Sequence, residues 1–472
     1  MTSSIKQELL RALPSITDLL AGEMVAGWLA EHPRGLVTIC LRDAVEEIRG
    51  NILNDTGGRC GAAHASVEYV LELAAGKLAD RTSPHVRGAI NATGIILHTA
   101  LGRAVWPESV VDSISDELKG YVTLAIDRET GKRSDRDERI EYLLTELTGA
   151  EAGMVVNNNA AATMLVLAAL AAGKEVVVSR GQLVEIGGSF RLPDVMAQSG
   201  ATLVEVGATN RTHPKDYAEV ISMKTAALLR VHPSNYRVIG FTREVSLAEM
   251  SEVAEAQGVM LIDDLGAGAL VGLEQFALPH EPTVRESIDA GAHIVLFSAD
   301  KLIGAAQGGV IVGRKDLIAR IRKHPLARAM RADKSCLMVL ERTLQMFRAP
   351  EKLPETHPLY RMLAAPLDML KARAETLGAK LGEALGGEIT VCEGVGYLGS
   401  GSLPTHELPT WVVKISLPDT PAAELARGLR TDDACVFTRI EDEQVVFDVR
   451  TITDAQIDPI AQALGRLASE MD

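Results

Sequence analysis

Between residues 86 and 345 the chain alternates short apolar segments with helical ones, and this alternation constrains the fold most strongly. Several of the apolar segments are hydrophobic at consecutive positions, which is typical of strands covered on both faces. The apolar segments lie at 154–156, 175–179, 202–207, 226–232, 259–264 and 293–298. Helices between such strands predict an α/β fold with a mostly parallel sheet and right-handed crossovers. The helix expected at 160–173 is apolar on nearly all sides and should be buried.

The regions on either side of this alternation have different patterns. Before it, apolar residues recur at helical spacing at positions 41, 45, 48 and 52. After it, the pattern predicts helices at 362–381 and 454–471, with strands at 388–394, 410–417, 434–440 and 444–450. We therefore expect three domains, a helical one at 1–85, an α/β domain at 86–345 and a small α+β domain at 346–472.

Composition excludes several classes of protein. The apolar runs are shorter than the roughly 20 residues that a membrane span needs. Five cysteines are scattered without a CxxC pair, so neither a metal site nor a disulfide framework is expected. The formal net charge is −15, whereas affinity for a phosphate backbone normally comes from clustered Lys and Arg. A nucleic-acid partner would therefore have to be bound through local patches and shape.

Chemically useful side chains follow two of the expected strands. Ser298, Asp300 and Lys301 come directly after the strand at 293–298, and a lysine amine that is kept unprotonated forms Schiff bases with carbonyl cofactors. Asp263 and Asp264 end the strand at 259–264, where a carboxylate can pair with a protonated pyridine nitrogen. Spacing alone favours a solvated surface lysine and a pair of aspartates in a turn or cap, and it does not select one aspartate.

A third element favours the cofactor interpretation. Asn157, Asn158 and Asn159 connect the strand at 154–156 to the buried helix, whose free N–H groups and dipole suit a phosphate. The asparagines can also simply cap the helix. A phosphate cradle, a strand-end acid and a lysine after a strand, in this order, match the fold-type I architecture of enzymes that use pyridoxal 5′-phosphate.

One glycine motif resembles a dinucleotide-binding site, but its sequence context argues against that function. Gly394, Gly396 and Gly399 spell G-x-G-x-x-G, but the dinucleotide fingerprint requires a helix to open there. Here Pro404 and Pro409 follow instead, so a nicotinamide site is not expected.

Long segments of the chain resemble a known family. They are INATGIILHTALGRA (90–104), TGKRSDRDERIEYLLTELTGAEAGMVVNNNAAA (130–162) and SRGQLVEIGGSFRLPDVMAQSGATLVEVGATNRT (179–212). The match continues through RALPSITDLL, VHPSNYRVIGFT, DLGAGAL, FSADKLIG, HPLARAMRADK, GSGSLPTHELPTWVV and FTRIEDEQVVFDVRT. On these motifs the chain resembles the bacterial selenocysteine synthases, which are L-seryl-tRNA(Sec) selenium transferases, over nearly its whole length.

The resemblance implies roles for individual residues. Lys301 matches the lysine that binds pyridoxal 5′-phosphate, and Asp264, directly before the Leu-Gly of its motif, is the implied partner of the pyridine nitrogen. The implied cofactor pocket also includes Ser298 and, around the phosphate, Asn157, Asn158, Asn159, Ala160 and Ala161. In the family, arginines bind selenophosphate, and the matching positions in this sequence are Arg103, Arg328 and Arg331.

The implied reaction is a β-replacement that converts L-seryl-tRNA(Sec) to L-selenocysteyl-tRNA(Sec) through an aminoacrylyl-tRNA intermediate. Selenophosphate is the implied selenium donor, and Lys301 is the implied base that removes the Cα proton. In the family the N-terminal domain grips the tRNA, and active sites form between subunits in a ring of five dimers. We therefore expect a cytoplasmic homo-oligomer that binds seryl-tRNA(Sec) and no membrane.

Several positions depart from the family pattern, namely Ala100, Pro233, GAAQGG at 304–309 and SDRDERIE at 134–141. An alternative therefore stays open, a pyridoxal-phosphate ammonia-lyase or related enzyme acting on a small amino acid or amino sugar acid without tRNA. The acidic composition favours this lyase, whereas the helical region at 1–85 favours the synthase. Lys301 and Asp264 argue against a third alternative, a non-catalytic binding protein.

Overall fold

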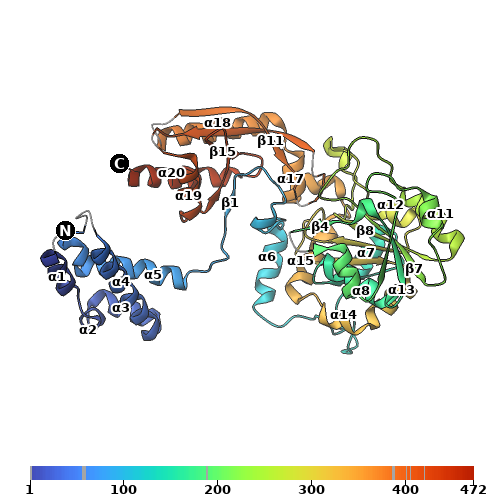
Figure 1. Cartoon of the computed structure of the whole chain (residues 1–472), viewed down its shortest axis with the longest axis horizontal. Coiled ribbons are helices and arrows are strands. Elements are labelled where there is room, and N and C mark those ends of the chain that lie inside the picture. Colours follow the sequence, from blue (N-terminus) through green and yellow to red (C-terminus); the bar gives the residue numbers. More distant parts are fainter. Residues whose placement is uncertain are drawn as a thin grey trace. The chain divides into compact units, whose positions relative to one another are not determined.

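The structure, a computed structural model, describes residues 3–55, 60–187, 190–384, 388–399, 401–403, 406–418 and 420–471. The chain divides into two compact units, Met1–Gly88 and Ala89–Asp472 (Figure 1). The domain boundaries expected after residues 85 and 345 stay a prediction. Among the described residues no helix is both long enough and apolar enough to cross a membrane.

The first unit is helical, as predicted. Its longest helix, α4, buries Leu41, Val45, Ile48 and Ile52, the residues whose spacing predicted it. These side chains pack with residues of the other helices into one apolar core. The α-helices described in this unit are α1 (Ser3–Ala12), α2 (Ile16–Leu20), α3 (Glu23–Glu31), α4 (Arg34–Asn54) and α5 (Val67–Thr82).

The second unit is built on a twisted sheet, in which the described strands number seven and follow the order β2-β10-β9-β8-β7-β3-β6. Only β10 runs antiparallel to its neighbours, so the expectation of a mostly parallel sheet is confirmed. Every strand predicted in this region is present. The bounds are β2 (Ala152–Val156), β3 (Glu175–Ser179), β6 (Thr202–Val206), β7 (Thr225–Val231), β8 (Met260–Gly266), β9 (Ile294–Ser298) and β10 (Gly309–Gly313).

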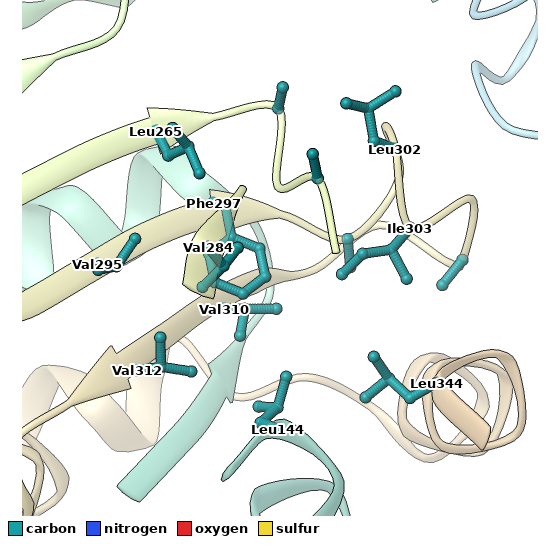
Figure 2. Packing of buried hydrophobic residues seen from close by; sticks show 14 of the residues in the cluster. Leu144, Leu265, Val284, Val295, Phe297, Leu302, Ile303, Val310, Val312 and Leu344 are labelled. Atoms are coloured by element: carbon teal, nitrogen blue, oxygen red, sulfur yellow. The ribbon is translucent and has the colours of Figure 1, made fainter. Parts of the chain in front are cut away.

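Helices cover both faces of this sheet. Alternate residues of β9 point to opposite sides, so that Val295 and Phe297 join one apolar core and Ile294 and Leu296 join the other. Figure 2 shows Phe297 packed with residues of the first core. The helix predicted at 160–173 is α8, which is buried in the second core. The helices here are α6 (Glu108–Leu118), α7 (Glu138–Thr148), α8 (Asn159–Ala171), α9 (Leu192–Gln198), α10 (Pro214–Ala218), α11 (Leu247–Gln257), α12 (Val284–Asp289), α13 (Lys315–Lys323), α14 (Pro325–Ala329), α15 (Lys334–Met346), α16 (Leu353–Thr356) and α17 (Pro358–Ala364).

The C-terminal part adds a smaller antiparallel sheet, in the order β11-β12-β15-β14 among the described residues. The helix expected at 362–381 is interrupted, because Pro366 has no N–H to donate within a continuous helix. The strand expected at 434–440 is also divided, since β13 pairs with β1 and β14 pairs with β15. The bounds are β1 (Ile90–Asn91), α18 (Leu367–Ala384), β11 (Glu388–Tyr397), β12 (Glu407–Ser416), α19 (Ala422–Thr431), β13 (Val436–Phe437), β14 (Arg439–Glu441), β15 (Gln444–Asp448) and α20 (Ile457–Met471). Elsewhere in the second unit, β4 (Glu185–Ile186) and β5 (Phe190–Arg191) pair with each other.

Candidate active site

Lys301 lies in a buried loop at the carboxyl end of β9. Its side chain is almost enclosed, with a residue exposure of 6%, and Ser298 at the end of the strand is also buried. Leu302 and Ile303, which follow it, are fully buried in the same apolar core as Phe297 (Figure 2). This apolar packing fixes the backbone of the loop that carries the Lys301 side chain.

Hydrogen bonds from the α16–α17 corner fix the same loop. Tyr360 Oη donates to the carbonyl of Leu302 at 2.8 Å, and His357 Nε2 donates to the carbonyl of Ile303 at 3.0 Å. Burial lowers the pKa of His357 to about 4, so the ring is neutral near pH 7. Gly304 has φ +70°, and a Cβ there would lie 2.2 Å from Cε1 of His357, so the tight turn requires glycine.

The two aspartates that end β8 have different environments. Asp264 lines a cavity with Lys301 and accepts hydrogen bonds from Asn159 Nδ2 and Thr163 Oγ1, both at 2.9 Å. Asp263 is fully buried on the opposite face of the strand. There its Oδ1 and Oδ2 accept hydrogen bonds from Arg230 Nη1 at 3.1 and 3.2 Å, and its Oδ2 accepts one from Ser287 Oγ at 2.7 Å. The geometry therefore favours Asp264 as the cofactor partner and gives Asp263 a structural ion pair.

Burial governs the charge state of the central lysine and carboxylate. It lowers the pKa of Lys301, and the positive charge of Arg103 adds to this effect while nearby carboxylates oppose it. Burial raises the pKa of Asp264, and the hydrogen bonds from Asn159 and Thr163 oppose that rise. A lysine whose neutral form is favoured is suited to act as a nucleophile and a base.

The asparagine segment begins helix α8 at the edge of the cavity. Asn158 caps the helix by accepting a hydrogen bond from the backbone N–H of Ala161 at 2.8 Å, as the capping alternative predicted. Asn158, Asn159 and Ala160 line the cavity, whereas Asn157 and Ala161 do not belong to its lining. Asn157 is exposed, and its backbone N–H donates to the carbonyl of Met330. The helix N-terminus thus offers the cavity a place for an anion, as the sequence indicated.

Arg103 reaches the same cavity. It has φ +68°, a conformation that costs energy for a residue with a side chain, and its Nη1 donates to Asp300 Oδ2 at 3.0 Å. The ion pair places a positive charge beside the lysine amine, which explains its effect on the pKa of Lys301. Asp300, which the sequence places between Ser298 and Lys301, therefore belongs to the candidate site.

Arg328 and Arg331 lie elsewhere in this chain. Both are exposed, and neither lines the cavity of Lys301. Burial and the charges of Arg136, Arg328 and Arg133 lower the pKa of Arg331, so these four guanidinium groups form a positive cluster. Arg331 also forms a backbone bridge with Val156, which places it next to the carboxyl end of β2. Within one chain, Arg103 lines the cavity of Lys301 whereas this cluster does not.

The cavity around Lys301 has a volume of about 260 Å³. Sequence reasoning missed several residues of its lining, including His232, Ser234 and Gln307. Two buried atoms next to it, His232 Nδ1 and Asn159 Oδ1, have no hydrogen-bond partner in the part of the chain that the structure describes. Unsatisfied polar atoms beside a reactive amine fit a pocket for a polar cofactor. The only signal for His232 was its place after β7, at the same sheet edge.

Comparisons with known proteins agree on one family. The family model described as "L-seryl-tRNA selenium transferase" matches residues 89–453, and the model described as "Selenocysteine synthase N terminal" matches residues 10–49. A protein from Geotalea daltonii named "L-seryl-tRNA(Sec) selenium transferase" is 42% identical over 97% of this chain and 98% of its own length. Proteins of the same name from Nitratidesulfovibrio vulgaris and Rhizobium meliloti are 42% and 41% identical, over 97% and 94% of this chain and 98% and 95% of their own lengths.

Among solved structures, one titled "Structure of D-Glucosaminate-6-phosphate Ammonia-lyase" is similar to this chain with a TM-score of 0.57. The identity is 21%, and the similarity covers 82% of this chain and 96% of the other. At this identity the likeness shows the fold alone, which confirms the predicted fold class. It does not favour the lyase alternative, because the relatives of higher identity bear the transferase name.

Proposed function

The chain belongs to the L-seryl-tRNA selenium transferase family, and on this basis we propose that it converts L-seryl-tRNA(Sec) to L-selenocysteyl-tRNA(Sec). The observation that carries the proposal is a family match over nearly the whole chain. The buried pocket that joins Lys301 to Asp264 supports it, because a pyridoxal-phosphate enzyme needs an amine and a carboxylate in this relation.

Pyridoxal phosphate is the cofactor, and the residues present fit it. Lys301 would hold its carbonyl carbon, Asp264 its pyridine nitrogen, and the N-terminus of α8 at Asn159 and Ala160 its phosphate. Ser298 and Arg103 line the same pocket. When bound, the cofactor supplies an electron sink for the charge that remains after a proton leaves Cα of the seryl group.

The protein's own residues would position and move the protons. Burial favours the neutral form of Lys301, so once the seryl amine has displaced it, its Nζ can take the Cα proton. The carboxylate of Asp264, held by Asn159 and Thr163, would stabilise a proton on the pyridine nitrogen. The loop fixed by Tyr360 keeps Nζ in the same place for both tasks.

The selenium donor is proposed to be selenophosphate. Arginine forks bind phosphate-like anions, and Arg103 lines the pocket while Arg328 and Arg331 belong to an exposed positive cluster. The two sets would meet if that cluster completes the pocket of another subunit, so a homo-oligomer, by resemblance a ring of dimers, is part of the proposal. The helical region at 1–85 is proposed to bind the tRNA, and the enzyme is proposed to act in the cytoplasm.

Conversion of radiolabelled seryl-tRNA(Sec) by the purified protein, with and without selenophosphate, tests the function. Label should appear as selenocysteine only when the donor is present, and Lys301→Ala should abolish it. A wild-type protein that retains its cofactor and leaves the seryl-tRNA unchanged would contradict the proposal.

A further inference from the structure

A second and larger cavity adjoins the cofactor pocket. It has a volume of about 530 Å³, and His232 lines both cavities. Its floor carries buried polar side chains, of which Ser179 and Thr212 hydrogen-bond each other at 2.7 Å and Gln182 accepts from the backbone of Val231. A concave space of this size with polar groups on a fixed floor has the character of a ligand site. Nothing in the proposed chemistry at Lys301 uses it.

The rim of this cavity carries arginines together with the exposed Glu244. Two loops form it, joined by backbone hydrogen bonds from Arg243 to Asn210 at 2.9 Å and from Thr212 to Arg243 at 3.0 Å. Three of the lining residues on these loops are Arg211, Arg237 and Arg243. Arg243 pairs with a glutamate, whereas the guanidinium of Arg237 is exposed and has no hydrogen-bond or ion-pair partner among the described residues. An unpaired guanidinium on this rim suits a phosphate group.

The wall between the two cavities contains unused acceptors. Glu281 is 3% exposed, and its Oε1, 3.4 Å from His232 Nε2, has no hydrogen-bond partner among the described residues. His232 Nδ1 has none either. Leaving such groups buried and unpaired is costly, so this wall fits a ligand that brings hydrogen-bond donors. Hydroxyl groups of a ribose and the amino group of a base are donors of this kind.

We propose that this cavity receives the 3′-terminal nucleotide of the aminoacylated RNA, with Arg237 contacting a backbone phosphate and Glu281 and His232 facing the ribose or base. This inference rests on the proposed function. The seryl group is esterified to the terminal ribose, so a serine that reaches Lys301 holds that nucleotide directly beside the cofactor pocket. The cavity that shares His232 with the pocket lies at that place. The unpaired Arg237 also supplies a local cation of the kind that a chain of net charge −15 needs for an RNA.

Binding of a short RNA end to the full-length holoenzyme tests this. The probe is the trinucleotide CCA that carries serine through a non-hydrolysable amide at its 3′ end. Arg237→Ala should raise its Kd about tenfold and lower the salt dependence of binding by about one phosphate contact. Val238→Trp, which places a bulky ring in the cavity, should also weaken binding. Cofactor absorbance should stay unchanged in both variants.

The matched control is Arg320→Ala, which removes an exposed arginine of α13 that lines neither cavity. Its Kd should equal that of the wild type. Equal Kd values for the wild type, Arg237→Ala and Val238→Trp would overturn the inference. Conversion of full-length seryl-tRNA(Sec) by the wild type reports separately on the proposed function, so a converting wild type with insensitive variants refutes the cavity assignment alone.

Discussion

Replacing each of the two adjacent aspartates of β8 by alanine should have opposite effects, one mainly on stability and the other mainly on cofactor binding. Asp263→Ala leaves Arg230, whose side chain is 15% exposed, without its carboxylate, and it leaves Ser287 Oγ with only its longer contact of 3.4 Å to the carbonyl of Thr283. Removing one partner of a buried ion pair costs about 3–5 kcal/mol. With an unfolding entropy of ~2.1 cal/mol/K per residue, this lowers Tm by about 4–6 °C for a unit of the size of Ala89–Asp472.

Asp264→Ala should change stability much less. The variant loses the hydrogen bonds from Asn159 and Thr163, but it also loses a carboxylate whose charge burial disfavours, so the net cost is about 1 kcal/mol. The bound cofactor, however, loses the partner of its ring nitrogen. A loss of about 3 kcal/mol there weakens cofactor binding more than a hundredfold.

Thermal unfolding of the apoproteins and the visible absorbance left after dialysis of the holoproteins separate the two effects. We expect a lower Tm with retained cofactor for Asp263→Ala, and an almost unchanged Tm with lost cofactor for Asp264→Ala. The reverse pattern would refute the assignment of Asp264 to the cofactor.

Further substitutions test the loop that carries Lys301, the lysine itself and the positive cluster around Arg331. Tyr360→Phe leaves the carbonyl of Leu302 without its partner, which costs about 1–3 kcal/mol and should lower kcat more than cofactor content, as steady-state rates and absorbance will show. Folding lowers the pKa of Lys301, so at pH values between the folded-state pKa and 10.5 the unfolded chain binds more protons than the folded one. The Tm of the apoprotein should therefore rise with pH in this range. This rise should be absent in Lys301→Met. Arg331→Ala should raise KM for selenophosphate about tenfold in steady-state assays and leave KM for seryl-tRNA(Sec) unchanged, and the opposite pattern would assign the cluster to the RNA.

The sequence was sufficient to place Lys301 and the two aspartates at the carboxyl ends of strands in a mostly parallel sheet, and the structure adds the order of those strands. These residues end or follow apolar runs that were assigned to parallel strands, and β8 and β9 are neighbours in the sheet. The carboxyl ends of neighbouring parallel strands meet at one edge, where such α/β folds bind ligands. The local sequence was also sufficient to reject the glycine motif as a dinucleotide site, since Gly394 and Gly396 lie inside strand β11.

Residues whose partners come from distant parts of the chain were not predicted. Adjacent strand residues face opposite sides, but only the fold shows that α8 lies on the side of Asp264 and Arg230 on that of Asp263. Glu281 lies outside any motif, and its position against His232 depends on the loop between β8 and β9. Family resemblance grouped three arginines, whereas in one folded chain only Arg103 of the three lines the pocket of Lys301.

Lys301 is expected to hold the cofactor in the pocket that it shares with Asp264. Borohydride reduction of the purified holoenzyme, followed by proteolysis and peptide mass spectrometry, tests it most directly, because reduction makes the lysine–cofactor linkage permanent. The reduced cofactor should be found on the peptide that contains Lys301. Its attachment to a different lysine, with Lys301 unmodified, would show that Lys301 does not hold the cofactor.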